Sequence, residues 1–338
     1  LKYGRGQGKG GSEFGFSLVT LDAEGDTGYW TQALFTEGQI HVVYQVNNLE
    51  AENNAGISQI RHIAFDPTQD AETVAAGVVP EVVLEGPGAE PCTGGCADGE
   101  VCAQNLTQCV VATADCGGAC GDTEACYQGA CEPVFTEGKP AGVSHTLGSF
   151  LELSAKPNGI LLLFYDGSQN SIGWVERSAG DAWTMPQYVG APSGPYASAL
   201  YDANNVLHVA YMDEPNYSLI YEQVGQNVSE VIAFGLRDSN DEWLLNRIGE
   251  SVTLRIGADG QPDVLYQDAT LHALIRSTRL GANQWATQTL AERGNPYTGA
   301  HGFYMTMIRE AGDAIAVEYV IDSQAEEPHA YPVFHALP

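Results

Sequence analysis

The stretch that decides the fold is GPYASALYDANNVLHVAYMD, residues 194–213. Two apolar runs, SALY and VLHVAY, flank an Asp-Ala-Asn-Asn turn, which is the pattern of an antiparallel hairpin. The second run ends at Tyr211, and an aspartate follows two residues later. Because the same phrase recurs along the chain, its repetition indicates the architecture better than any single hairpin does.

The recurring phrase is a short apolar run that ends in tyrosine, with aspartate or asparagine within three residues. It reads IHVVYQVN, LLLFYDGS, LHVAYMDE, DVLYQDA and IAVEYVID, and its tyrosines are Tyr44, Tyr165, Tyr211, Tyr266 and Tyr319. The last three intervals are 46, 55 and 53 residues. Such a period suits a four-stranded propeller blade. The sequence therefore predicts an all-β protein, a five-bladed β-propeller, with an insertion in its long first interval.

The two ends of the chain suggest how the ring closes. The last repeat has three clear strands, near YMTMIRE, AIAVEYVI and AYPVFHAL, whereas FGFSLVTLD (14–22) precedes the first repeat without a partner. We expect residues 14–22 to supply the missing outer strand by pairing near 330–337, because closure removes an exposed strand edge. No segment shows helical periodicity with caps, so little helix is expected.

These repeats resemble those of secreted bacterial propeller proteins, which read roughly Gly-x-x-x-Ser-Leu-x-x-Asp-x-x-Gly-x-x-His-Val-x-Tyr-x-Asp, followed by a tryptophan. Residues 194–213 match best, and GESVTLRIGADGQPDVLYQD (249–268) also fits, with Trp285 after it. The first and fifth repeats keep the tyrosine but little else. The resemblance implies the fold and says little about function, because propellers host many activities.

All eight cysteines lie in the first interval and form two tandem quartets. Their near-duplicated spacing in a Gly-rich context predicts two small units with two disulfides each. Neither quartet contains a CxxC pair or a histidine, which disfavours the zinc alternative. The segment resembles the Cys-Gly-rich modules of secreted myxobacterial proteins, and three pairings per quartet remain open. The quartets are Cys92, Cys96, Cys102 and Cys109, then Cys116, Cys120, Cys126 and Cys131.

Pro/Gly-rich flanks at 86–91 and 135–142 are typical of linkers and delimit this module. The module leaves after the outer strand of the first blade and returns before the inner strand of the second, so we expect it beside the ligand-binding face. The predicted organisation is a flexible segment (1–13), the closing strand with blade one (14–90), the cysteine-rich module (91–133), and blades two to five (134–338).

Charge and composition narrow the location and the partners. Asp and Glu number 43 against 14 Lys and Arg, a formal net charge of -29, so nucleic acid is not an expected partner. No apolar run is long enough to span a membrane. The disulfides and the non-Met start place the mature protein, after signal removal, in an extracellular, periplasmic or cell-surface location.

Cofactor binding is not required by any motif. Ca²⁺ is the one cofactor left open, because Asp-rich loops occur at 166–170, 202–205 and 238–242. None has the register of a dedicated calcium loop. The alternative is that these aspartates cap strand ends by accepting backbone N–H groups in turns.

Candidate ligand-binding residues come from the predicted starts of the inner strands, which ring the mouth of the channel. Histidine, carboxylate and aromatic side chains there suit a sugar or a metal. The alternative is that they fill a narrow channel and pack against one another. The candidates are Tyr29, Trp30, His145, Tyr196, Glu250 and His301.

Catalytic signatures are sparse. The sequence contains no GxSxG, HExxH, P-loop or CxxCH motif. Glu250 is the carboxylate at an inner-strand start, with Asp26 as a candidate second one. The sequence favours a non-catalytic extracellular protein that binds a protein or glycan, or joins a larger envelope assembly. The alternative is a propeller glycoside hydrolase that uses axial carboxylates.

The cysteine pattern makes a direct prediction for mass spectrometry. Alkylation of the unreduced protein should find no free thiol, and non-reducing peptide maps should find every bridge within 92–109 or within 116–131. A bridge between the quartets would contradict the two-unit interpretation, and retained zinc would contradict the disulfide interpretation.

Overall fold

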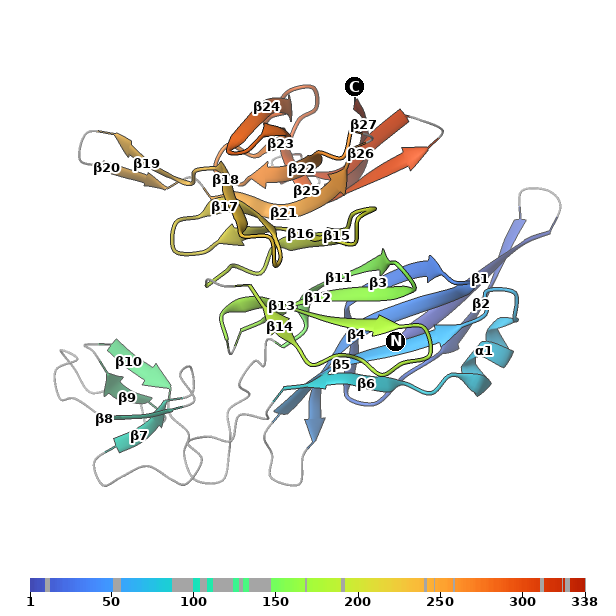
Figure 1. Ribbon diagram of the computed structural model, residues 1–338. Coiled ribbons are helices and arrows are strands. Elements are labelled where there is room, and N and C mark those ends of the chain that lie inside the picture. The colour runs from blue at the N-terminus through green and yellow to red at the C-terminus, as the bar shows by residue number, and fades with distance from the viewer. Residues whose placement is uncertain are drawn as a thin grey trace. The chain divides into compact units, whose positions relative to one another are not determined.

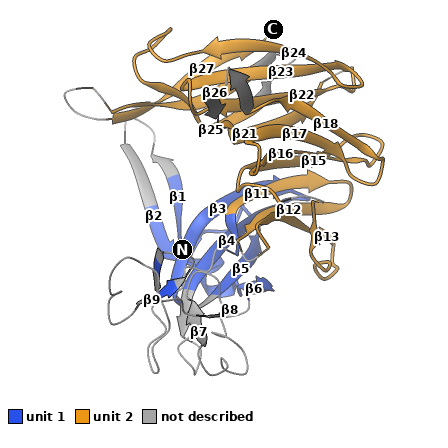
Figure 2. Cartoon of the chain, turned by 90° about the vertical axis from the view of Figure 1, so that its left-hand side faces the viewer, with its two compact units in different colours: residues 1–149 blue, residues 150–338 orange. Residues whose placement is uncertain are grey.

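The protein divides into two compact units, residues 1–149 and 150–338 (Figure 2), and each unit has its own hydrophobic core. The computed structural model describes residues 1–9, 13–50, 56–86, 100–103, 108–111, 124–127, 130–133, 147–167, 169–189, 192–239, 242–245, 247–257, 259–310, 313–323, 325 and 329–337.

Five antiparallel sheets, the blades, account for most of the described residues, so the predicted five-bladed β-propeller is confirmed (Figure 1). In each blade the strands pair in chain order. The first blade has β3 (Asp26–Thr36), β4 (Gln39–Glu50), β5 (Gly56–Phe65) and β6 (Glu81–Glu85). The second has β11 (Ser149–Lys156), β12 (Gly159–Asp166), β13 (Ser171–Ser178) and β14 (Gln187–Tyr188). The third has β15 (Ala197–Tyr201), β16 (Leu207–Asp213), β17 (Ser218–Gln223) and β18 (Val228–Ala233).

The remaining two blades follow the same order. The fourth has β21 (Ile248–Ile256), β22 (Pro262–Asp268), β23 (Ala273–Gly281) and β24 (Gln284–Ala291). The fifth has three strands, β25 (Ala300–Glu310), β26 (Asp313–Asp322) and β27 (His329–Leu337). The repeat tyrosines lie on the second strand of each blade, and Tyr44, Tyr211 and Tyr266 are buried there, whereas Tyr319 is 42% exposed.

Outside the blades, the described residues form one short helix and four hairpins. The helix, α1 (Ala71–Gly77), begins after Asp70, whose side chain accepts the N–H of Thr73 as an N-cap. The hairpins are β1 (Lys2–Lys9) with β2 (Glu13–Thr20), β7 (Glu100–Ala103) with β8 (Gln108–Val111), β9 (Glu124–Tyr127) with β10 (Ala130–Pro133), and β19 (Leu236–Ser239) with β20 (Glu242–Leu245).

Apolar side chains between consecutive blades hold the second unit together. One core cluster joins Leu161 and Trp174 of blade two to Val209 of blade three. A second joins Tyr221 of blade three to Tyr266 of blade four. A third joins Leu265 of blade four to Met305, Ala316 and Leu337 of blade five. Each blade thus covers a face of its neighbour, which is how a propeller buries its sheets.

The prediction that residues 14–22 close the ring on the last blade is wrong. Residues 13–20 form β2, which pairs in register with β1, from Glu13 opposite Lys9 to Thr20 opposite Lys2. Residues 1–9, expected as a flexible segment, thus form a strand. Tyr3 packs on Phe65 with ring centroids 5.0 Å apart, and the Ser17 hydroxyl donates to Glu72 of α1. The N-terminal hairpin therefore packs against the first blade as a separate two-stranded sheet.

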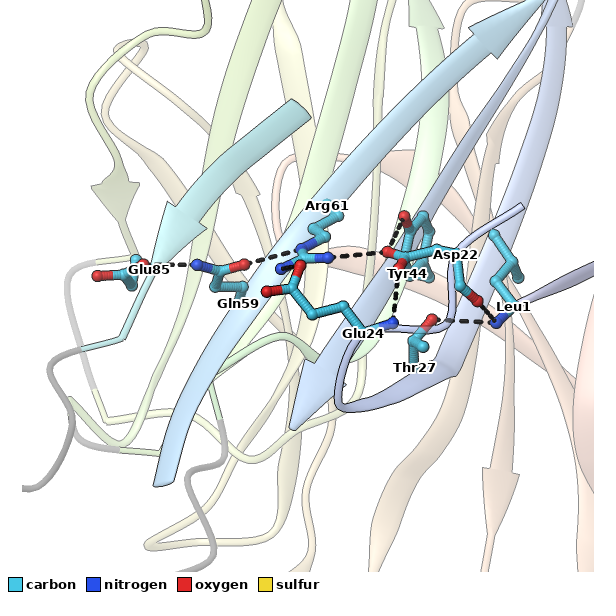
Figure 3. A network of polar contacts seen from close by, with 8 residues as sticks. All are labelled: Leu1, Asp22, Glu24, Thr27, Tyr44, Gln59, Arg61 and Glu85. Atoms are coloured by element: carbon cyan, nitrogen blue, oxygen red, sulfur yellow. Dashed lines mark hydrogen bonds and ion pairs between the residues drawn. The ribbon is translucent and has the colours of Figure 1, made fainter. Parts of the chain in front are cut away.

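A buried polar network gives the physical reason for this placement (Figure 3). Asp22, directly after β2, accepts a hydrogen bond from the Tyr44 hydroxyl at 2.7 Å and one from Arg61 at 2.9 Å. Arg61 also contacts Glu24 and Gln59. Because both members of the Asp22–Arg61 pair are buried, moving Asp22 away would leave Arg61 with a poorly compensated charge.

The cysteine-rich segment is described only in short pieces. Cys126 and Cys131 are both disulfide-bonded. The predicted pairing within each quartet, and the zinc alternative, lie outside the described residues. No helix in the described part of the chain is long and apolar enough to cross a membrane.

The Asp22 network predicts unequal effects for two neighbouring carboxylates. Asp22→Ala should lower the free energy of unfolding by about 3 kcal/mol, because it removes one partner of a buried ion pair. Glu24→Gln, at a side chain 68% exposed, should cost under about 1 kcal/mol. Urea unfolding of the three proteins checks this, and equal losses for both variants would contradict the anchoring role of Asp22.

Candidate functional site

The first strand of each blade is called its inner strand. In three blades the pairing of this strand with the second strand is distorted near its start. In β21 the pairing register with β22 shifts on both sides of Glu250, and in β25 it shifts on both sides of Phe303. β3 has the same pair of shifts around Tyr29. We call this arrangement the double bulge. Such bulges re-aim side chains and often lie next to functional sites.

A Gly-x-Z motif forms the double bulge, where Z is the third residue. The glycine has positive φ at Gly28, Gly148, Gly249 and Gly302, with values of 101°, 83°, 92° and 87°. The Z residue also has positive φ, between 47° and 53°, at Trp30, Phe150, Ser251 and Tyr304. Positive φ is costly for large side chains, at roughly 1–3 kcal/mol each, and such strain gathers at functional sites.

In residues 150–338, aromatic and carboxyl groups near the starts of four inner strands lie close to one another. The Phe150 and Tyr196 rings meet edge to face with centroids 4.8 Å apart. Tyr304 is 72% exposed, and both Glu250 and Tyr304 lie near enough to Tyr196 to help raise the pKa of its hydroxyl, after the larger effect of burial. We define the inner-strand site as Phe150, Glu152, Tyr196, Ser198, Glu250 and Tyr304.

Glu152 is the most perturbed carboxyl group of this site. It lies on β11 and accepts a hydrogen bond from the Ser198 hydroxyl of β15 at 2.8 Å. Ser198 in turn accepts the Leu254 N–H of β21 at 3.0 Å, so three inner strands converge here. The residue keeps some exposure, but protein atoms enclose its carboxyl group, and this burial raises the pKa of Glu152 to about 8. Glu152 is therefore protonated at neutral pH.

Glu250, predicted from sequence, lies in the double bulge of β21. Its carboxylate is 2.8 Å from the Arg247 guanidinium, which also lies over the Tyr217 ring at 5.5 Å. The inner-strand site thus holds a neutral carboxylic acid and an ion-paired carboxylate beside aromatic rings. That combination suits the binding of a neutral sugar and acid–base chemistry on it.

The other site residues predicted from sequence are not part of the inner-strand site as defined. His301 is fully buried and faces Glu318 rather than solvent, with 2.8 Å between its Nδ1 and the Glu318 Oε1. His145 lies outside the described residues, and the Gly-x-Z residue of its blade is Phe150. Tyr29, Trp30 and Asp26 are exposed on β3 of the first unit.

Sequence reasoning missed Glu152, Phe150 and Tyr304. The Gly-x-Z spacing was available as a signal, since Gly148, Gly194 and Gly302 each precede an aromatic residue by two positions. Glu152 follows Phe150 by two residues on β11. No local pattern marks its burial, which depends on the neighbouring blade.

The aspartates proposed as calcium ligands have local partners. Asp202 accepts the backbone N–H groups of Asn204 and Val206 at 2.9 and 2.7 Å, and Asp166 accepts the Tyr188 hydroxyl at 2.9 Å. The Asp202 contacts are those of a strand-end turn, and calcium binding by these loops stays a prediction. The loop at 238–242 lies partly outside the described residues.

The raised pKa of Glu152 predicts a pH-dependent stability. The folded protein keeps this proton between pH 4.5, the ordinary value, and about 8, whereas the unfolded chain loses it. The contribution of this proton to the free energy of unfolding is thus complete below pH 4.5 and is lost as pH rises to about 8. Relative to the wild type, Glu152→Gln should gain stability from pH 5 to pH 8.5 in urea unfolding. The exposed control Glu292→Gln should show no such trend, and parallel curves for Glu152→Gln and wild type would contradict the buried acid.

Comparisons with known proteins give the following. No family model and no curated protein matches the sequence. Among solved structures, an endo-arabinase from Bacteroides thetaiotaomicron is similar, with a TM-score of 0.44, 9% identity, and 92% of this chain and 94% of that chain covered. An exo-β-1,3-galactanase from Phanerochaete chrysosporium has a TM-score of 0.43 and 9% identity. The match covers 94% of this chain and 61% of that chain. A bifunctional GH43-CE protein from Bacteroides eggerthii has a TM-score of 0.42 and 8% identity. The match covers 90% of this chain and 32% of that chain. This chain thus spans a third to two thirds of the length of some similar structures, and likeness at this level is a likeness of chain trace.

Proposed function

We propose that this protein is a propeller-type glycoside hydrolase, whose inner-strand site binds a neutral sugar between Glu152, Glu250 and the aromatic side chains of neighbouring blades. The observation that carries the proposal is the convergence of inner strands at the hydrogen bond between Glu152 and Ser198, next to the Phe150–Tyr196 ring pair. Aromatic faces stack on the apolar faces of sugar rings, and carboxyl groups bind their hydroxyls.

The two carboxyl groups divide the chemistry between them. Glu152, protonated at neutral pH, donates its proton to the glycosidic oxygen as the bond from that oxygen to the anomeric carbon breaks. Glu250, whose carboxyl oxygen is 2.8 Å from the Arg247 guanidinium, acts as base toward water or as nucleophile at the anomeric carbon. When Glu250 is the base, it takes the proton of the attacking water, and exchange with solvent resets both carboxyl groups. When Glu250 is the nucleophile, Glu152 takes the proton of the water that releases the sugar from Glu250. This is the pairing of an acid and a base set by different surroundings.

Hydrolysis of a panel of aryl glycosides and soluble polysaccharides tests the proposal. Against a substrate that is cleaved, Glu152→Gln and Glu250→Gln should each lower kcat/KM by roughly 10²–10⁴-fold, whereas Glu292→Gln should not. Wild-type activity should fall as pH rises past about 8, because Glu152 then loses its proton. Proton NMR of the first product anomer distinguishes the base from the nucleophile. Retention of activity in Glu152→Gln would overturn the assignment.

A non-catalytic glycan-binding role is the second candidate, and it is favoured by the exposure of Tyr304. It predicts that the wild type binds members of the same panel in affinity electrophoresis without cleaving any of them. Tyr304→Ala should then weaken binding, while Glu152→Gln should leave it nearly unchanged.

The extracellular or cell-surface location stays part of this proposal, as do a protein partner or membership of an envelope assembly. The module at 91–133 is likewise proposed to be two disulfide-bonded units that extend the ligand-binding face. The high content of acidic residues favours uncharged or cationic partners over anionic ones.

A further inference from the structure

A histidine–glutamate–histidine cluster spans the three strands of the last blade. His301 lies on β25, Glu318 on β26 and His335 on β27. Glu318 Oε1 is 2.8 Å from His301 Nδ1 and 2.6 Å from His335 Nε2. One nitrogen or oxygen atom from each residue lies within 4.8 Å of the other two. Three potential metal-ligand atoms therefore lie close enough together to bind one ion.

Two further polar atoms of the cluster have hydrogen-bond partners outside it. His301 Nε2 is 3.3 Å from the Tyr297 carbonyl oxygen, and the Gly302 N–H donates to Glu318 Oε2. In protein metal sites, a ligating histidine usually gives its second N–H to a carbonyl or carboxylate, and ligating carboxylates are themselves hydrogen-bonded. The cluster therefore has the supporting contacts of a metal site as well as its ligands.

Burial leaves one side for an ion to enter. The side chains of His301 and Glu318 are fully buried, whereas that of His335 is 12% exposed. A tetrahedral ion with ligands at about 2.1 Å would set them roughly 3.4 Å apart. The two contacts of Glu318 Oε1, at 2.8 and 2.6 Å, would each lengthen by less than about 1 Å, and the third pair of ligand atoms lies within 4.8 Å.

We propose that His301, Glu318 and His335 form a binding site for a divalent transition-metal ion, best matched by Zn²⁺, with a fourth position open to water beside His335. Two imidazoles and one carboxylate suit zinc, whereas calcium and magnesium prefer sites built from oxygen atoms. The ion would lie where His301 Nδ1 and His335 Nε2 now face Glu318 Oε1.

The same ion would support the inner-strand site without touching a substrate there. Gly302, whose N–H is held by Glu318, is the glycine of the double bulge that presents Tyr304. Metal binding would therefore hold the Tyr304 bulge through Glu318. The metal proposal does not depend on hydrolysis and is tested without a glycan.

The experiment uses tag-free, chelator-treated protein in which a thiol assay confirms that no cysteine is free. Titration calorimetry with Zn²⁺ should give one site per chain, and Zn²⁺ should raise Tm, whereas Mg²⁺ should not. His335→Gln should abolish the site, and the control His329→Gln, an exposed residue on the same strand, should keep it. Circular dichroism verifies that both variants fold.

Co²⁺ gives a second readout on the wild-type protein. Its absorption spectrum should show a low-symmetry nitrogen and oxygen site without the charge-transfer band of thiolate ligands. A thiolate band would assign the metal to the cysteine segment and overturn the proposal. Absence of one-to-one Zn²⁺ binding, or unchanged affinity in His335→Gln, would also overturn it and leave the cluster as a structural hydrogen-bond network.

Discussion

Burial of the second strand of each blade on both faces is the constraint on which the rest of the structure depends. On β22, Val264 and Tyr266 pack in the cluster shared with blade three, whereas Leu265 between them packs in the cluster shared with blade five. Alternate side chains thus serve opposite neighbours. A single blade would expose these apolar faces to water, so the stability of each blade depends on contact with its neighbours.

The same burial dictates how polar side chains inside the blades must be arranged. Asp263 of β22 is 2% exposed and is contacted by Arg255 and Arg276 from the strands on either side. A charge in this position is tolerated only with partners, because burial removes its hydration. Glu318 is satisfied in the same way, and its nitrogen donors hold its pKa near 2 despite burial. In contrast, Glu152 has only a hydroxyl and a backbone N–H beside it, so burial dominates and the acid stays protonated.

The sequence predicted what repeats and missed what depends on contacts between distant residues. The tyrosine phrases located the second strand of every blade, because a strand buried on both faces must be almost continuously apolar. The N-terminal hairpin was misplaced because its position depends on Asp22 meeting Arg61, two residues whose pairing no local pattern reveals. His335 and Glu318 escaped notice for a similar reason, since only the register of β25, β26 and β27 aligns them with His301.

The double bulge also bears on how such a protein diversifies. In the double bulge the pairing register shifts on both sides of one residue. The side chain of the next residue therefore does not follow the strand alternation, which directs neighbouring side chains to one face of the blade or the other. Its identity can then change without repacking a core. Four repeats of this chain already carry different residues at the positive-φ third position of the Gly-x-Z motif, namely Trp30, Phe150, Ser251 and Tyr304. Gene duplication followed by single substitutions at these positions would give new recognition surfaces on an unchanged framework, with the backbone strain inherited along with the glycine that precedes it.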